Sequence, residues 1–494
     1  MGPLEAGVLL LLCLLFPLLL SSFKMYKKIV QLPPGPTPWL FLGNILQKNV
    51  FPLYTFYPKL VEKYGPIFTI WMGPNPAIVL CGYEVIKDAM VNHAEVFGGR
   101  YTIPITDRVY KAQGMRTKDD TKWRELRRFT LSTLRDFGMG KKTMSERVQE
   151  EACCLVKDIT ASVQGNKFDL SKSITNAASN VICSVLLGRR FDYQDEMFKG
   201  HLHIVTQLMS LFVSYSGMLL SCFPPMMDCL PGPHKKVFAD CKGLQAHFRE
   251  EMESHKLTLD PENPRDYIDC FLIKLEKEKN SPGTWYGKED LVMCVFELFL
   301  ASTLTTSHSL LFAIFMMARF PDIQAKVQEE INEVIHTNRV PGMEDRVRMP
   351  FTNAVIHEIL RYLKASNDNF PHSTTCCVEF RGFTIPKGTA IIPSFTSVNF
   401  DPLHWETPEE FNPAHFLDNK GQFKKNNAFM AFGAGKRACP GEVLARMELF
   451  IFFSTLLQSL RFQLVEEVTD TDPLSLFIKY TNKGQILPIQ AIKR

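Results

Sequence analysis

The chain has 494 residues, and its apolar content of 46% is enough to build a large core. Its formal net charge of +4 is spread along the chain, which gives no indication of nucleic-acid binding. The 13 cysteines do not have the spacing of a disulfide framework, so we expect free thiols in a reducing compartment. No repeat or flexible linker divides the chain after residue 45, which favours one large domain over residues 46–494.

The N-terminus begins with a leucine-rich apolar run at residues 6–23, followed by Lys24, Lys27 and Lys28. A cleaved signal peptide would carry its positive charge before such a run and end in small residues. The run is just long enough to span a bilayer, and the positive-inside rule leaves the lysines cytosolic. We therefore expect an uncleaved membrane anchor over residues 1–28. Residues 29–45 include the sequence LPPGPTP, whose prolines predict a stiff, extended hinge.

The next segments predict a mostly helical protein with a small amount of sheet. Short β-rich runs at residues 67–73 and 77–81 flank a Pro-Asn-Pro turn and predict a hairpin. Residues 204–230 predict helices joined by a bend at Pro224-Pro225. Residues 291–318 form a long apolar run that resembles a membrane span in composition. The polar residues within that run favour instead a helix buried in protein with a polar patch halfway along.

Two pairs of residues have helical spacing. Trp123 and Arg127 lie one turn apart, and so do Glu358 and Arg361. Taken alone, the first pair is typical of an amphipathic helix with an exposed arginine. The second, taken alone, is an ion pair worth a few tenths of a kcal/mol.

The most informative stretch is FGAGKRACPG at residues 432–441, which precedes a strongly helix-forming apolar run. The glycines let the backbone approach the sulfur of Cys439 closely. The first amides of the following helix have no partner within it, so they can stabilise a thiolate. Arg437 adds a cation nearby, and a thiolate is the form of cysteine that ligates a metal. A lone intracellular cysteine is usually an ordinary buried residue, but this pattern is too dense for that interpretation.

Phe-x-x-Gly-x-Arg-x-Cys-x-Gly before a long helix resembles the haem-binding loop of the cytochrome P-450 family, in particular the vertebrate microsomal family 2 group. The resemblance implies a single large haem domain of mostly α structure with small β-sheets behind an N-terminal transmembrane anchor. It also implies haem (iron protoporphyrin IX) as cofactor, with Cys439 as the axial thiolate ligand of the iron. By the same resemblance, Trp123, Arg127, His372 and Arg437 are expected to hold the haem propionates.

On the other face of the haem, the family pattern is Ala-Gly-x-Asp/Glu-Thr, where this chain has Ala-Ser-Thr-Leu-Thr at residues 301–305. The resemblance makes Thr305 the catalytic hydroxyl, while Leu304 replaces the acid that delivers protons. The alternative for Thr305 is a purely structural role, in which its hydroxyl donates a hydrogen bond to a backbone carbonyl of its own helix.

The expected substrate pocket is unusually polar, with residues that depart from the family pattern. These residues are Arg116, Thr117, Asn367 and Asp368, and we also expect the pocket to include Ala301, which keeps the family pattern. Such a pocket suits a substrate with a charged or hydroxylated end. Alternatively, Arg116 and Asp368 neutralise each other or point away from the cavity.

The resemblance assigns a structural role to Glu358 and Arg361. His415, at a position commonly filled by arginine, is the expected third member of an ion cluster that braces the haem loop. It also suggests that a set of basic residues docks an electron-donating flavoprotein: Arg124, Arg128, Arg135, Lys141, Lys142, Lys424, Lys425 and Lys436.

The implied function is an NADPH- and O₂-dependent monooxygenase at the endoplasmic reticulum membrane with a cytosolic catalytic domain. Its substrates would be apolar or amphipathic molecules, and its partners membrane lipid, a separate reductase and cytochrome b5. Two alternatives remain: a lipid-hydroperoxide isomerase or dehydratase of the same fold, and a haem-binding relative with little catalysis. Leu304 motivates the isomerase and Thr305 weakens it.

Overall fold

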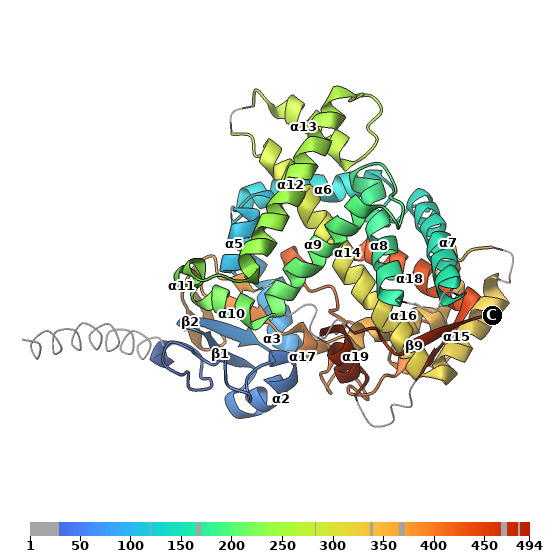
Figure 1. The fold of residues 1–494 in the computed structure, drawn as a ribbon. Helices are drawn as coiled ribbons and strands as arrows, with labels where there is room; N and C mark the ends of the chain where they lie inside the picture. The colour runs from blue at the N-terminus through green and yellow to red at the C-terminus, as the bar shows by residue number, and fades with distance from the viewer. Residues whose placement is uncertain are drawn as a thin grey trace, which may run out of the picture.

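The computed structural model describes residues 29–118, 120–164, 169–281, 283–335, 339–364, 371–465, 472–482 and 485–494. Helices make up most of the fold, as the sequence predicts (Figure 1). The helices are α2 (Leu53–Tyr64), α3 (Tyr83–Lys87), α4 (Ala94–Phe97), α5 (Pro104–Tyr110), α6 (Asp120–Asp136), α7 (Lys142–Gln164), α8 (Leu170–Leu186), α9 (Glu196–Val213), α10 (Tyr215–Cys222), α11 (Pro224–Cys229), α12 (Pro233–Leu257), α13 (Tyr267–Glu278), α14 (Lys288–Arg319), α15 (Pro321–Ile335), α16 (Pro350–Tyr362), α17 (Phe395–Asn399), α18 (Glu442–Ser459) and α19 (Pro473–Asn482). Shorter turns of helix are η1 (Asp88–Asn92), η2 (Gly114–Arg116), η3 (Met343–Arg348), η4 (Pro413–Phe416) and η5 (Gly435–Arg437).

The largest sheet has five strands in the order β1-β2-β7-β4-β3. Strands β5 with β6 and β8 with β9 form two further ladders. The strands are β1 (Ile67–Met72), β2 (Asn75–Leu80), β3 (Gly99–Arg100), β4 (His372–Ser373), β5 (Val378–Phe380), β6 (Phe383–Ile385), β7 (Ala390–Pro393), β8 (Leu460–Leu464) and β9 (Ile489–Lys493). The hairpin prediction is confirmed, because β1 and β2 pair antiparallel.

Helix α14 runs through the middle of the helical part and contacts α8, α12, α16 and α18 (Figure 1). Of the described helices, it is the one long and apolar enough by itself to cross a membrane, yet most of it is buried in protein. The prediction of a buried core helix at residues 291–318 is therefore confirmed.

Helices α9 and α12 pack against each other and against α14 (Figure 1). The chain bends by 65° at the break between α9 and α10, which the sequence does not predict. Helix α11 begins at Pro224, where the sequence predicts a junction between helices. Large apolar side chains are exposed at this bend: Val213 is 71% and Tyr215 78% accessible.

The expected membrane anchor lies outside the described residues. The proline-rich stretch that follows it is held against β1 by hydrogen bonds. The amide of Thr69 donates to the carbonyl of Pro34 at 3.0 Å, and its hydroxyl donates to that of Pro33 at 2.8 Å. A side chain at Gly35 would collide with the backbone of Thr69, 1.9 Å from its carbonyl oxygen. From Pro33 onward, the chain is thus attached to the domain.

Candidate functional site

The loop that carries Cys439 is fixed from both ends. The amide of Cys439 donates to the carbonyl of Phe432 at 2.9 Å, which closes the loop just before α18 begins. Gly435 has a φ of 73° and lies so close to η1 that a Cβ atom there would be 1.8 Å from the carbonyl oxygen of Met90. Glycine is required at this position on both counts.

The side chain of Cys439 is exposed by area although protein surrounds most of it. Burial raises the pKa of the Cys439 thiol above its ordinary value, while backbone hydrogen bonds from Gly441 and Glu442 and the charge of Arg127 act to lower it. The two amides lie at the N-terminus of α18, as expected from the sequence. The site therefore combines an accessible sulfur with groups that favour its thiolate form.

Three residues predicted as a cluster lie together beside this loop. The guanidinium of Arg437 stacks 3.5 Å from the ring centroid of Trp123, and Nε of Arg437 donates to the carbonyl of Gly98 at 3.0 Å. Arg127 lies 5.7 Å from the same ring and donates to the carbonyl of Ala438 at 2.5 Å. Two arginines from distant parts of the chain therefore share one aromatic platform.

The sheet adds His372 and a residue that the motifs do not predict, Arg100. These two residues are paired in the antiparallel register of β3 and β4. The imidazole Nδ1 lies 3.0 Å from the carbonyl oxygen of Phe97, and burial together with Arg100 and Arg437 lowers the pKa of His372 to about 3. Nδ1 therefore carries the proton that Phe97 accepts.

The charges around Arg100 fit an anionic group. Burial and the neighbouring charges of Arg116, Arg437 and Arg127 lower the pKa of Arg100 to about 9. Burial and Arg127 likewise lower the pKa of Arg437 to about 10, although Asp120 opposes this. Cations that repel one another in a partly buried site are stabilised by an added carboxylate. The two propionates of a haem would supply such carboxylates, so these residues fit that group.

Helix α14 is buried along most of its length but has an accessible stripe in its middle. Ala301, Thr305 and His308 are exposed, and they recur at helical spacing on one face. The hydroxyl of Thr305 donates to the carbonyl of Ala301 at 2.8 Å, which is the back-bonded geometry considered above as the alternative. Leu304 is half-buried on the same helix, where it packs against the core.

The N-terminal part of α14 holds η2, which carries Arg116. Asp290 accepts the amide of Gly114 at 3.0 Å, and Glu297 accepts the amides of Met115 and Arg116 at 2.9 and 3.2 Å. Burial raises the pKa of Glu297 to about 8, against the lowering effect of Arg116. In the sequence, two acids seven positions apart on an apolar helix indicate that they bind something, but they do not indicate which group they bind.

The expected pocket residues divide into two groups. Arg116 lies 5.0 Å from the ring centroid of Tyr110, Thr117 is buried beside it, and Ala301 lies on the stripe of α14. Asn367 and Asp368 lie outside the described residues. Whether the two groups meet is thus still a prediction.

Glu358, Arg361 and His415 form the cluster expected from the sequence. Nε and an Nη of Arg361 donate to the two carboxylate oxygens of Glu358 at 2.8 Å, and Nδ1 of His415 lies 3.2 Å from both. Burial would raise the pKa of Glu358, but the hydrogen bonds from Arg361 and His415 hold it below its ordinary value. Arg361 also donates to three backbone carbonyls, those of Asn399, Pro408 and Glu410.

A family model described as Cytochrome P-450 matches residues 33–488. The chain belongs to the cytochrome P-450 family. It is 43% identical to cytochrome P-450 2C20 of Macaca fascicularis over 95% of each chain. It is 41% identical to cytochrome P-450 2B4 of Oryctolagus cuniculus over 99% of each chain, and 42% identical to cytochrome P-450 2C8 of Homo sapiens over 94% of each. This P-450 is accordingly a haem enzyme of the unspecific monooxygenase type, with the mostly α fold of its family.

Proposed function

We propose that this P-450 inserts one oxygen atom from O₂ into a C–H or C=C bond of an apolar or amphipathic molecule, such as a fatty acid, steroid or xenobiotic. Electrons would come from NADPH through a separate flavoprotein reductase. Cys439 is the proposed axial ligand of the haem iron. The accessible sulfur of Cys439, faced by the amides of Gly441 and Glu442, carries the proposal.

When bound, haem supplies the oxygen activation, while the protein sets its ligand, orientation and surroundings. Arg127 and Arg437 would each bind a propionate, because a guanidinium matches the geometry of a carboxylate. Trp123 supports both cations through its ring. His372 would bind a propionate through Nε2 once that nitrogen is protonated, since Nδ1 is engaged by Phe97. Arg100 joins this proposed group on the charge argument above.

On the side of α14, Thr305 is the proposed catalytic hydroxyl. Its proton goes to the carbonyl of Ala301, so its oxygen is the acceptor that can hold an incoming water or substrate proton. The small side chain of Ala301 leaves room on the accessible stripe. Because Leu304 has no acidic group, proton transfer along this stripe depends on water and is expected to be inefficient.

The substrate is expected to be amphipathic rather than purely apolar. Arg116 is the last residue of η2, the segment that Glu297 holds against α14, and Thr117 directly follows it. With Asn367 and Asp368, they would offer polar partners to a charged or hydroxylated end of the substrate. Glu297 restrains the backbone of this segment, so the position of these side chains is set in advance of binding.

The proposed location is the endoplasmic reticulum membrane, with the haem domain in the cytosol and lipid in contact with the chain. The apolar run at residues 6–23 and the exposed side chains of Val213 and Tyr215 support this proposal. The basic residues around α6 are proposed to dock the reductase, with cytochrome b5 as a second donor. Four of them already have acidic partners: Arg124 and Lys436 contact Glu95 at 2.7 and 3.0 Å, Arg128 contacts Glu125 at 2.7 Å, and Lys142 lies 3.8 Å from Glu146.

The experiment that tests the ligand is Cys439→Ser. We expect the variant to lose the spectrum typical of a thiolate-ligated haem in the reduced, carbon monoxide-bound protein, together with turnover. Cys376→Ser, which alters another exposed cysteine, should change neither. An unchanged carbon monoxide spectrum in Cys439→Ser would overturn the assignment.

The isomerase alternative is favoured by Leu304 alone. It predicts rearrangement of an added lipid hydroperoxide without NADPH or reductase. Product formation that requires NADPH and reductase supports the monooxygenase instead. Silence in both assays, with a normal carbon monoxide spectrum, would indicate a haem-binding relative with little catalysis.

A further inference from the structure

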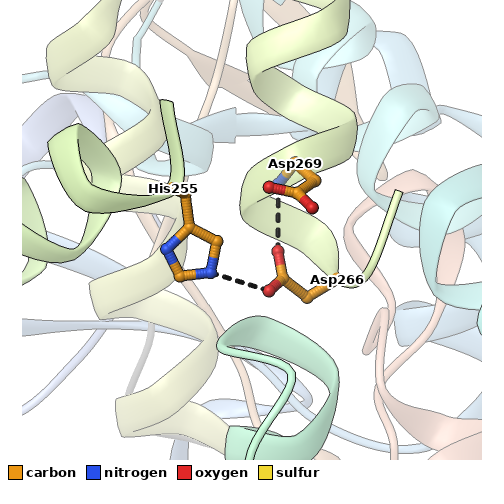
Figure 2. A group of neighbouring side chains, drawn as sticks. All are labelled: His255, Asp266 and Asp269. Carbon is orange, nitrogen blue, oxygen red and sulfur yellow. Dashed lines mark hydrogen bonds and ion pairs between the residues drawn. The ribbon is translucent and has the colours of Figure 1, made fainter. Parts of the chain in front are cut away.

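One group of ionisable side chains away from the haem site, His255, Asp266 and Asp269, is complete without a ligand (Figure 2). Nε2 of His255 lies 2.8 Å from Asp266, and Nδ1 lies 2.7 Å from the carbonyl oxygen of Glu251. Asp266 also accepts the amide of Asp269 at 2.9 Å, and the carboxylate of Asp269 binds the guanidinium of Arg265. The donors and acceptors of this group are satisfied by protein, so its role is to cap α13.

A second group surrounds a cavity between β3, α5 and η2. The described side chains that line it include three cations, Arg100, Arg116 and Lys118, and one acid, Asp107. Asp107 lies 3.9 Å from Lys118, so its contact is with the most exposed of the three cations. Threonine and tyrosine hydroxyls from α5 and the residues before it complete the lining. Cations and hydroxyl donors around one cavity are suited to an anion.

This cavity is separate from the cluster proposed to hold the haem propionates. A different cavity lies at that cluster and is lined by His372 and Arg437. Neither of these residues lines the cavity of Arg116, and Arg100 is the member of the propionate group that does. Arg116 therefore faces a different space from that of the propionate cluster.

Two contacts fix Arg116 relative to α14. Its guanidinium lies 5.0 Å from the ring centroid of Tyr110, and that ring lies 5.9 Å from the ring of Phe296, edge to face. The backbone of η2 is hydrogen bonded to Glu297, the next residue of α14. Thr305 lies further along the same helix, roughly 12 Å from Glu297 in the direction of the axis. A molecule that lies along α14 can therefore contact both Arg116 and Thr305.

The charges around the cavity favour an added anion. Burial and the charge of Arg116 are the two largest causes that lower the pKa of Arg100 to about 9. Burial raises the pKa of Glu297 to about 8, so this acid carries little negative charge near pH 7. An oxyanion beside the two arginines would offset their repulsion, whereas a neutral or cationic group would not.

We propose that this cavity binds the anionic end of the substrate, and that Arg116 selects amphipathic molecules that carry a carboxylate or a sulfate. The inference rests on the proposed function, because it names the substrate class of the same enzyme. A guanidinium presents a planar fork of donors that matches an oxyanion. The apolar remainder of the substrate would lie along α14 toward Thr305. The bond presented for oxidation would thus lie several carbons away from the acid group.

The test compares dodecanoate with methyl dodecanoate, which has the same chain without the charge. Equilibrium dialysis of the haem-loaded full-length protein gives the Kd of each ligand. The ratio of the two Kd values is compared between proteins, because partition of the ligands into detergent cancels in that comparison. The parent should prefer dodecanoate by about tenfold or more. Arg116→Gln should bring the ratio close to that of equal binding, and Arg116→Lys, which keeps the charge without the fork, should fall between.

The matched control is Arg108→Gln. Arg108 is an arginine of α5 with its own acidic partner, Asp228 at 2.7 Å, and it does not line the cavity. A normal carbon monoxide spectrum in every variant shows that the haem site is intact. The proposal is overturned if the parent has no preference for the acid, if Arg116→Gln keeps that preference, or if Arg108→Gln loses it.

Turnover separates this proposal from the proposed function. A preference that depends on Arg116, without oxidation of dodecanoate by NADPH and reductase, would support the anion site and overturn the proposed oxidation. Oxidation of both ligands with equal affinity would do the reverse. Mass spectrometry of the product from dodecanoate should place the new oxygen away from the carboxyl end. Oxidation next to the carboxyl group would contradict the alignment of the substrate along α14.

Discussion

The two sides of the proposed haem site are built in different ways. On the side of Cys439, charged groups are fixed by hydrogen bonds to distant backbone, as Arg127 is to Ala438 and Arg437 to Gly98. On the side of α14, the hydroxyl of Thr305 bonds within its own helix, and the neighbouring Leu304 is apolar. The first side depends on the whole fold, whereas the second depends on the choice of single side chains. Substitutions on the first side should therefore affect stability and haem binding, and those on the second should affect chemistry.

The largest effect is expected where the first side is most deeply buried. Arg361→Leu would leave the carboxylate of Glu358 buried without its main partner, and both side chains are fully buried. Breaking such a pair costs about 3–5 kcal/mol. Denaturant unfolding of the parent and the variant measures the loss.

The control for this comparison is Arg128→Leu, which removes an exposed partner of Glu125 at the same 2.7–2.8 Å range of separation. An exposed pair of this kind is worth about 0.5 kcal/mol or less. Equal losses in the two variants would contradict the claim that burial makes the Glu358 cluster important.

A second effect is expected at the cations. Arg437→Leu removes the stack on Trp123 and one proposed partner of a propionate. Charge-assisted hydrogen bonds contribute about 1.5–3 kcal/mol, so haem should leave the variant roughly 10- to 100-fold faster. Transfer of haem to an excess of an acceptor protein measures this rate, and Arg135→Leu, an exposed cation of α6, is the control. A normal rate in Arg437→Leu would show that the propionates bind elsewhere.

A smaller effect is expected on the side of α14, and it concerns the fate of oxygen rather than stability. Leu304→Glu restores an acid beside Thr305, so the ratio of product to released peroxide should rise by about twofold or more. The control is Leu304→Gln, because the glutamine side chain is nearly the same size as glutamate but has no acidic proton. This variant should behave like the parent. Peroxide release that is equal in all three proteins would count against the proton-delivery argument.

The smallest effect lies outside both sides. This effect concerns His255 on α12. The hydrogen bond of His255 to Asp266, opposed in part by burial, raises the pKa of His255 above its ordinary value. The resulting stability is fully present below the ordinary pKa of about 6.5 and is lost as the pH rises through the folded-state value. The difference between parent and His255→Gln should thus shrink from slightly acidic to alkaline pH, by about 1 kcal/mol or less. Denaturant unfolding of both proteins at one slightly acidic and one alkaline pH checks this. A difference in unfolding free energy that grows with pH would contradict it.

The sequence predicts the parts of the site whose residues are close together in the chain. The loop around Cys439, the Trp123–Arg127 turn and the Glu358–Arg361 turn all have their spacing set by one local element. Helix α14 was equally predictable, because its apolar run and polar interruptions fall within a single stretch. The mostly helical fold with small sheets followed from the same kind of local pattern.

Arg100 could not be predicted in this way. Its position depends on a ladder of two residues in which β3 pairs with β4, far away in the chain. The role of Glu297 was also hidden, because it binds amides of η2, and amides leave no trace in a sequence. The back-bonded geometry of Thr305 depends on a rotamer, which a motif does not specify. In each case the missing information is tertiary geometry rather than residue type.

The attachment of η2 to α14 has a consequence for how this enzyme can diversify. Asp290 and Glu297 accept hydrogen bonds from the backbone amides of Gly114, Met115 and Arg116. These hydrogen bonds do not involve the side chains of Met115 and Arg116. Exchange of Met115 or Arg116 therefore keeps the amide donors of these hydrogen bonds, but loss of the Arg116 charge also removes a group that lowers the pKa of Glu297, and Met115 packs against the core. Gly114 is different, because its φ of 66° and a Cβ position 2.9 Å from Met293 both exclude larger residues. Substitutions at residues 115 and 116 can therefore change the side chains of this segment while Asp290 and Glu297 still bind its backbone amides.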